Sequence, residues 1–189
     1  MSNIHDYWQW PNVLNNERII EINNFIENNF IGLENKDQGA KDIKGNYKKN
    51  STVKIISLGL IKNLIPDLID NVVLSSQQNF GYNIFYPNNL DNCNLNIYSS
   101  KNKEKYDWHI DNSRSDLYDI KLTVLINLSL KPYTGGKFYL FNTNEREVEE
   151  LNNPGNMIMF KSHINHKVTT ITKGERRTLA IFLKGPKFR

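Results

Sequence analysis

Residues 176–183 read RRTLAIFL and form the most informative stretch of the chain, because their pattern is typical of a β-strand with one buried face. Side chains alternate between the two faces of a strand, so the apolar positions 179, 181 and 183 lie together and must be buried. Arg176 then faces the other way, beside Thr178. A guanidinium in such an interior is costly unless an anion meets it, and a carboxylate is its natural partner. Arg177 is interpreted as a surface arginine at the strand end.

Short alternating runs separated by turns lead back from this strand through the second half of the chain. The runs are residues 94–98, 106–110, 120–130, 137–141, 157–160 and 166–171, with tight turns at Gly135-Gly136 and Pro154-Gly155. Together with residues 176–183, these runs predict a mostly β protein built as a sandwich or jelly roll.

The first half of the chain is predicted to support this β-structure. Residues 15–29 place apolar side chains at three- and four-residue spacing, which predicts an amphipathic helix, and Pro66 suits the first turn of a second helix. Residues 51–58 are rich in β-branched side chains and predict a strand. Residues 32–50 are rich in Lys, Asp, Asn and Gly and predict a long mobile loop, either a solvated connector or a substrate-facing lid, of which the connector is favoured.

Length and composition limit the class of protein. With 189 residues, 39% of them hydrophobic and 23% charged, the chain is predicted to be one soluble globular domain over residues 1–189, with helical support and the early strand in 1–93 and the β core in 94–189. No apolar run reaches the length of a membrane span and the first residues lack the layout of a signal peptide, so we expect no membrane partner and a cytoplasmic protein. The net charge of +4 is spread along the chain and does not favour nucleic acid as a partner.

A metal site in this chain would depend on histidines and carboxylates. Cys93 is the single cysteine, so it cannot join a CxxC zinc site. His109 and Asp111 are two residues apart and would point the same way from an ideal strand, with Tyr106 and Trp108 on the opposite, packing face. This HxD pattern is weak by itself, because it arises often by chance.

A second histidine strengthens the pattern. His166 begins another predicted strand some 55 residues after Asp111, and two histidines with one carboxylate form the facial triad of non-haem Fe(II) oxygenases. His163 is expected to face away from His166, in a loop or supporting role, because the two are an odd number of residues apart. Asp107 remains open as either a partner of His109 or a solvated residue.

The order of these residues resembles a known family. It is similar to that of the 2-oxoglutarate- and Fe(II)-dependent dioxygenases, specifically the prolyl hydroxylase-like group with its PKHD-type and viral members. The resemblance is dense from about Asn94 to Arg189, includes the closing stretch GERRTLAIFLKGPKFR, and rests on His109-x-Asp111, Gly135-Gly136, Pro154-Gly155, Phe160, His166 and Gly174-x-Arg176.

The resemblance implies a fold and a set of site residues. The fold is a double-stranded β-helix, a jelly-roll, cupin-like core with supporting helices. Fe(II) would be bound by the catalytic triad His109, Asp111 and His166, and the distal carboxylate of the cosubstrate 2-oxoglutarate would bind Arg176. Tyr98 and Thr123 would line the cosubstrate pocket, although Tyr98 is equally well interpreted as a core tyrosine. The family more often has a tyrosine where this chain has Asn127, which leaves the second cosubstrate contact open.

The implied activity is hydroxylation of an unactivated C–H bond, with release of succinate and CO2 and stimulation by ascorbate. A prolyl residue in a peptide or protein is the leading substrate. The alternatives are the same chemistry on a free amino acid or other small molecule, and a non-catalytic β-helix binding module. A nucleic-acid demethylase is disfavoured, because the second arginine of that relative would fall on Phe182. Substrate contacts are expected in residues 32–50 and 112–119.

Overall fold

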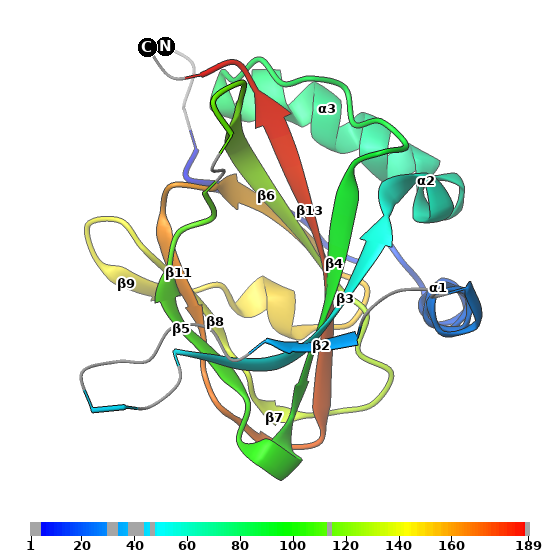
Figure 1. Ribbon diagram of the computed structural model, residues 1–189, viewed down its shortest axis with the longest axis vertical. Coiled ribbons are helices and arrows are strands. Elements are labelled where there is room, and N and C mark those ends of the chain that lie inside the picture. Colours follow the sequence, from blue (N-terminus) through cyan, green and yellow to red (C-terminus); the bar gives the residue numbers. More distant parts are fainter. Residues whose placement is uncertain (1–4, 30–33, 38–43, 46–47, 113–114, 188–189) are drawn as a thin grey trace.

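The architecture is one curled antiparallel sheet with helices on its outer side (Figure 1). The computed structural model describes residues 5–29, 34–37, 44–45, 48–112 and 115–187. Within these residues, no helix has both the length and the apolar character needed to cross a membrane.

The sheet has the strand order β1-β10-β6-β13-β4-β3-β5-β11-β8-β9, and β2 pairs with β3 beside this path. It bends within β3, because residues 52–57 pair with β4 whereas Lys49 and Asn50 pair with β5. The bend turns the half that contains β4, β6, β10 and β13 toward the half that contains β5, β8, β9 and β11 (Figure 1). The predicted double-stranded β-helix is therefore confirmed.

The strands have the following bounds: β1 Tyr7–Trp10, β2 Glu34–Asp37, β3 Lys49–Ser57, β4 Asn92–Ser99, β5 Lys105–His109, β6 Asp119–Asn127, β7 Thr134–Gly135, β8 Phe138–Phe141, β9 Glu145–Glu147, β10 Met157–Lys161, β11 Asn165–Val168, β12 Ile171–Lys173 and β13 Glu175–Gly185. Strands β7 and β12 form a separate two-stranded sheet at the turn before β13. The helices are α1 Asn16–Asn29, α2 Leu58–Ile61 and α3 Pro66–Phe80, with short 3-10 turns at Lys62–Leu64, Ser100–Asn102 and Glu149–Asn152.

Local sequence explains where the longest helix begins and ends. Pro66 occupies the first turn of α3, where its missing N–H costs nothing and its fixed φ suits the helix. Gly81 ends the helix in the left-handed conformation at φ 69°, and its N–H donates to the carbonyl of Gln77. The apolar face of α3 then packs on the outer side of the sheet.

Two apolar clusters lie on opposite faces of the half of the sheet that contains β4, β6, β10 and β13. One joins the helices to the sheet and includes Leu95 from β4 and Leu179 from β13, both fully buried. The other lies inside the curled sheet and includes Phe138 and Phe160. The alternation expected of β13 is confirmed, because its odd positions from 179 to 183 are in the first cluster while Arg176 faces the interior.

The structure differs from the predicted elements in several places. The aromatic residues at the start of the chain form β1, an unexpected strand that pairs with β10. The predicted loop 32–50 contains β2 and the first residues of β3, while its residues 32–33, 38–43 and 46–47 lie outside the described part. The predicted strands 120–130 and 166–171 are shorter, ending at Asn127 and Val168.

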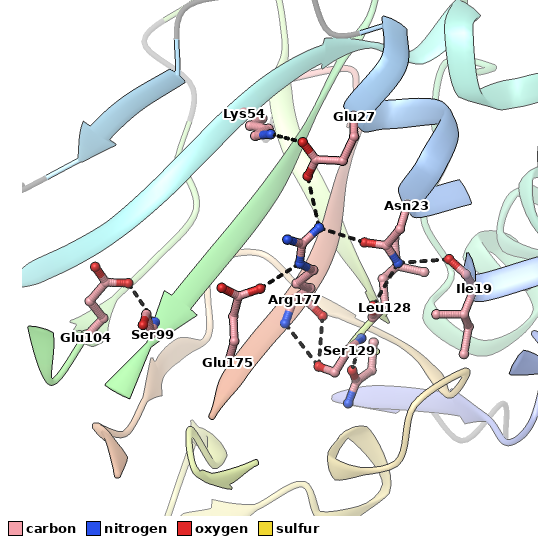
Figure 2. A network of polar contacts seen from close by, with 11 residues as sticks. Ile19, Asn23, Glu27, Lys54, Ser99, Glu104, Leu128, Ser129, Glu175 and Arg177 are labelled. Carbon is pink, nitrogen blue, oxygen red and sulfur yellow. Dashed lines mark hydrogen bonds and ion pairs between the residues drawn. The ribbon is translucent and has the colours of Figure 1, made fainter. Parts of the chain in front are cut away.

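Arg177 is not the surface arginine predicted from the sequence, because it connects α1 to β13 (Figure 2). Its Nη1 lies 3.0 Å from Glu27 Oε1 and 3.1 Å from Asn23 Oδ1, and its Nε lies 2.8 Å from Glu175 Oε1. Glu27 also pairs with Lys54 of β3 at 2.6 Å. The side chain of Arg177 is only 18% exposed, so this network helps to hold the first helix against the sheet.

Candidate metal centre and its cavity

The structure brings the three predicted metal ligands together from separate parts of the chain. His109 is the last residue of β5, Asp111 follows it by two residues, and His166 lies on β11 directly opposite His109. Their ligand atoms all lie within 4.8 Å of one another. Nε2 of His109 and Nε2 of His166 lie 3.9 and 3.5 Å from the carboxylate oxygens of Asp111.

An irregularity in β5 aims His109 into the interior. His166 pairs with His109 and Val168 pairs with Tyr106, so the register shifts between these two pairs. Three residues along β5 correspond to two residues along β11. Such a bulge reverses which side chains share a face. Tyr106 therefore lies on the same side as His109, with its ring stacked on the imidazole at a centroid distance of 3.4 Å. The prediction that Tyr106 would belong to the opposite face is wrong for this reason.

Both imidazoles are held by backbone carbonyls. Nδ1 of His109 lies 2.8 Å from the carbonyl oxygen of Asp107, and Nδ1 of His166 lies 2.9 Å from that of Ile164. A carbonyl oxygen only accepts, so each Nδ1 carries the hydrogen and each Nε2 keeps a lone pair for a metal ion. Asp107 thus supports His109 through its backbone, which settles the role that the sequence left open.

Burial keeps His109 in the form that binds metal. Burial, and to a smaller extent the neighbouring His166, lower the pKa of His109 to about 3. An imidazole with so low a pKa is neutral at ordinary pH, so a metal ion would not compete with a proton for its Nε2.

Asp111 is oriented by two hydroxyl groups and one backbone bond. Thr123 of β6 donates its hydroxyl hydrogen to Asp111 Oδ2 at 2.7 Å, and the Thr123 oxygen lies 3.0 Å from Ser162 Oγ. The Asp111 N–H donates to the carbonyl of Ser162 at 2.9 Å. Thr123 was predicted to contact the cosubstrate. Its hydroxyl lines the cavity but is bonded to the carboxylate, so that contact stays a prediction.

The three ligands open into a cavity of about 150 Å³ that also contains Arg176. The guanidinium is fully buried, and its Nε and Nη2 have no hydrogen-bond partner in the described part of the protein. Tyr98, opposite Arg176 on β4, lies with its ring 5.8 Å from the guanidinium carbon. Buried N–H groups of a cation require an acceptor, so this end of the cavity fits an anion.

A glycine makes room for Arg176. Gly136 has a φ of +62°, and a Cβ at this position would lie 3.0 Å from Arg176 Cδ and would collide with the side chain of Ile171. Gly136 is therefore needed for the space that Arg176 occupies as well as for the turn.

Sequence reasoning assigned no role to one polar residue of the cavity wall. Thr178 is one step along β13 from Arg176, and its buried hydroxyl also lacks a partner among the described residues. The alternation of β13 places it beside Arg176, but no role was assigned to it. Asn127 does not line the cavity, because its amide donates to Leu151 and Tyr133. His163 is exposed in the turn before β11 and is outside the ligand cluster, as predicted.

Comparisons with known proteins agree with this fold. The model of the 2OG-Fe(II) oxygenase superfamily matches residues 93–184. A prolyl-4-hydroxylase from Pseudomonas putida has 17% sequence identity and a TM-score of 0.71, and the match covers 97% of this chain and 94% of that one. A Trichoplax adhaerens prolyl hydroxylase in complex with a peptide fragment of hypoxia inducible factor has 16% identity and a TM-score of 0.65, covering 96% and 84%.

The fold is also shared with an enzyme of different chemistry. A non-haem α-ketoglutarate-dependent carbocyclase from nogalamycin biosynthesis has 11% identity and a TM-score of 0.65, with 96% of this chain and 80% of that one covered. Among curated proteins, none matches the sequence closely enough to count as a relative. At these identities, the structural comparisons establish the fold and leave the substrate open.

A double-stranded β-helix with a His-Asp-His cluster and a buried arginine defines the class of non-haem iron oxygenases that use a 2-oxo acid. The whole site lies within residues 93–184, the part of the chain that matches the model of the 2OG-Fe(II) oxygenase superfamily. The residues present fit the two groups that this family implies. Two neutral imidazoles and a carboxylate suit Fe(II), and the unpartnered Nε and Nη2 of Arg176 suit a carboxylate of 2-oxoglutarate.

Proposed function

We propose that this protein is a 2-oxoglutarate- and Fe(II)-dependent dioxygenase that hydroxylates a prolyl residue in a peptide or protein, releasing succinate and CO2. The single observation that carries the oxygenase chemistry is the presence of the His109, Asp111 and His166 cluster and the unpartnered Arg176 in one cavity. The Pseudomonas putida and Trichoplax adhaerens prolyl hydroxylases among the structural neighbours support the prolyl substrate.

Each residue then has a defined task in this proposal. His109, Asp111 and His166 hold Fe(II), while Arg176 and Tyr98 hold the distal carboxylate of 2-oxoglutarate. When bound, Fe(II) and 2-oxoglutarate supply the oxidising chemistry, in which one oxygen atom of dioxygen enters the substrate and the other enters succinate. Phe138 and Phe160 pack against His166, with ring centroids 5.7 and 4.7 Å from the imidazole, and they help to exclude water.

A free amino acid or another small molecule is the second candidate substrate. The carbocyclase among the structural neighbours favours it, because that enzyme has the same fold and is named for a reaction in natural-product synthesis. The cavity chemistry is common to both candidates, so the choice depends on what the protein binds beside the metal.

Succinate formation tests the proposal directly. Purified protein with Fe(II), ascorbate and 2-oxoglutarate should form succinate, and a proline-rich peptide should increase the rate. Asp111→Ala is the blank, because removal of the carboxylate should abolish iron binding and turnover. Ascorbate is expected to stimulate, which an assay without it checks.

The possible results of this assay distinguish the prolyl peptide substrate, the oxygenase activity and the non-catalytic module. Triad-dependent turnover that no peptide stimulates would overturn the prolyl peptide and leave the oxygenase. Absence of both iron binding and 2-oxoglutarate binding would overturn the oxygenase and favour the non-catalytic module.

A further inference from the structure

Strand β4 presents a row of polar side chains to the cavity. Asn94, Asn96 and Tyr98 face the interior, whereas Cys93 and Leu95 on the other side are fully buried against the helices. The first two of these polar residues have no task in the proposed oxygenase site. They are nevertheless part of its wall.

The carboxamides of Asn94 and Asn96 differ in their hydrogen bonds from those of two buried asparagines of this chain. Asn127 and Asn156, which are buried elsewhere, both bond through their side chains to backbone groups. Asn94 and Asn96 are half-buried, and their side chains make no hydrogen bond with any residue that the structure describes. A half-buried carboxamide that faces a cavity without such a bond is available to donate to a ligand and to accept from it.

Strand register locates the row relative to the rest of the site. Asn96 lies opposite Thr178, and Asn94 lies opposite Ala180 one step nearer to Phe182. Phe182 in turn lies opposite Thr123, whose hydroxyl holds Asp111. The row therefore leads from the anion-binding end toward the level of the metal ligands.

The chemistry of the row indicates its ligand. A carboxamide offers two donors and one acceptor oxygen, which matches the N–H and C=O of a peptide group. We propose that Asn94 and Asn96 recognise the main-chain amide of a peptide substrate. This inference rests on the proposed oxygenase function and deepens it, because a row of neutral carboxamides matches the neutral amide of a peptide better than the charged ends of a free amino acid.

Replacement of each asparagine by leucine, which has nearly the same shape, tests the inference. The probes are a pooled set of end-blocked, proline-containing hexapeptides and free L-proline, with succinate formation as the readout. Asn94→Leu and Asn96→Leu should each raise KM for the peptides roughly 10-fold, while KM for 2-oxoglutarate stays within about 2-fold. Asn94→Asp, which keeps the acceptor and the size, should lose less than Asn94→Leu.

Asn71→Leu is the matched control, because Asn71 is exposed on α3, which lies on the other side of the sheet. It should leave both KM values unchanged.

Each remaining outcome is decisive. An unchanged peptide KM in the Asn94 and Asn96 variants would overturn the inference and leave the proposed function standing. A rise in KM for 2-oxoglutarate instead would assign the row to the cosubstrate and also overturn it. Stimulation of the wild-type protein by L-proline and not by peptides would overturn the inference and the peptide substrate. Absence of succinate with every probe would overturn the proposed function itself.

Discussion

The two faces of strands β4 and β13 differ in whether their side chains find partners within the protein. The face toward the helices carries Leu95, Leu179 and similar side chains, all packed within the chain. The face toward the cavity carries Arg176 and Thr178, whose buried polar atoms have no partner in the described protein. One face is therefore built for stability and the other for a ligand. A substitution on the helix-facing side should therefore lower mainly the free energy of unfolding. A substitution on the cavity side should weaken mainly ligand binding.

The largest effect on stability is expected on the helix-facing side. Leu179→Ala should lower the free energy of unfolding by about 2–5 kcal/mol, because Leu179 is fully buried and its removal leaves a cavity. Urea unfolding followed by circular dichroism measures this change. A loss below about 1 kcal/mol would contradict the packing described for this face.

The corresponding change on the cavity side should affect binding. Arg176→Met should raise KM for 2-oxoglutarate about 100-fold, because the carboxylate loses its charged partner. Iron binding should persist, and the free energy of unfolding without ligands should stay the same or rise, since a buried unpaired cation is removed. Titration of 2-oxoglutarate and urea unfolding of the ligand-free protein measure the two parts. Unchanged KM would place the anion elsewhere.

The sequence could predict which side chains belong to each of these two faces. The period-two pattern of residues 176–183 predicted which side chains share the buried apolar face, and it placed Arg176 on the opposite, interior face. The family resemblance carried by the order of His109, Asp111 and His166 was enough to predict the ligand cluster. These features depend on local alternation and on residue type.

Features that depend on strand pairing could not be predicted. The bulge in β5 reverses the side on which Tyr106 lies, and it exists only because β5 meets β11. Arg177 contacts Glu27, 150 positions earlier, so its network is invisible in the local sequence. The four-residue strand β1 is too short for a clear pattern and forms because β10 offers an edge.

Thr123 provides a smaller, more selective test of the cavity face. Thr123→Val keeps the shape but removes the hydroxyl that donates to Asp111 Oδ2, so iron affinity should fall about 10–100-fold. Thr178→Val is the matched control, because its hydroxyl makes no bond to the triad and its loss should leave iron affinity unchanged. Equilibrium titration with Fe(II) under anaerobic conditions measures both. If Thr123→Val changed only KM for 2-oxoglutarate, Thr123 would be a cosubstrate contact, as the sequence predicted.

The smallest effect is expected outside both faces, where Glu27 joins Lys54 and Arg177 (Figure 2). The hydrogen bond from Lys54 lowers the pKa of Glu27 from its ordinary value of 4.5, with further lowering by Arg177. A lowered folded-state pKa contributes stability above the ordinary pKa, and this contribution disappears as the pH falls through the folded value.

Glu27→Gln should therefore lower the free energy of unfolding by less than about 1 kcal/mol at pH 7, because the carboxylate is 42% exposed and screened by solvent. In strong acid it should lower it by nothing. Urea unfolding at pH 7 and in strong acid measures the difference, with Glu21→Gln on the exposed side of the same helix as control. A loss that is equal at both pH values would mean that Glu27 acts through packing, and the charged network would then contribute nothing to holding α1 against the sheet.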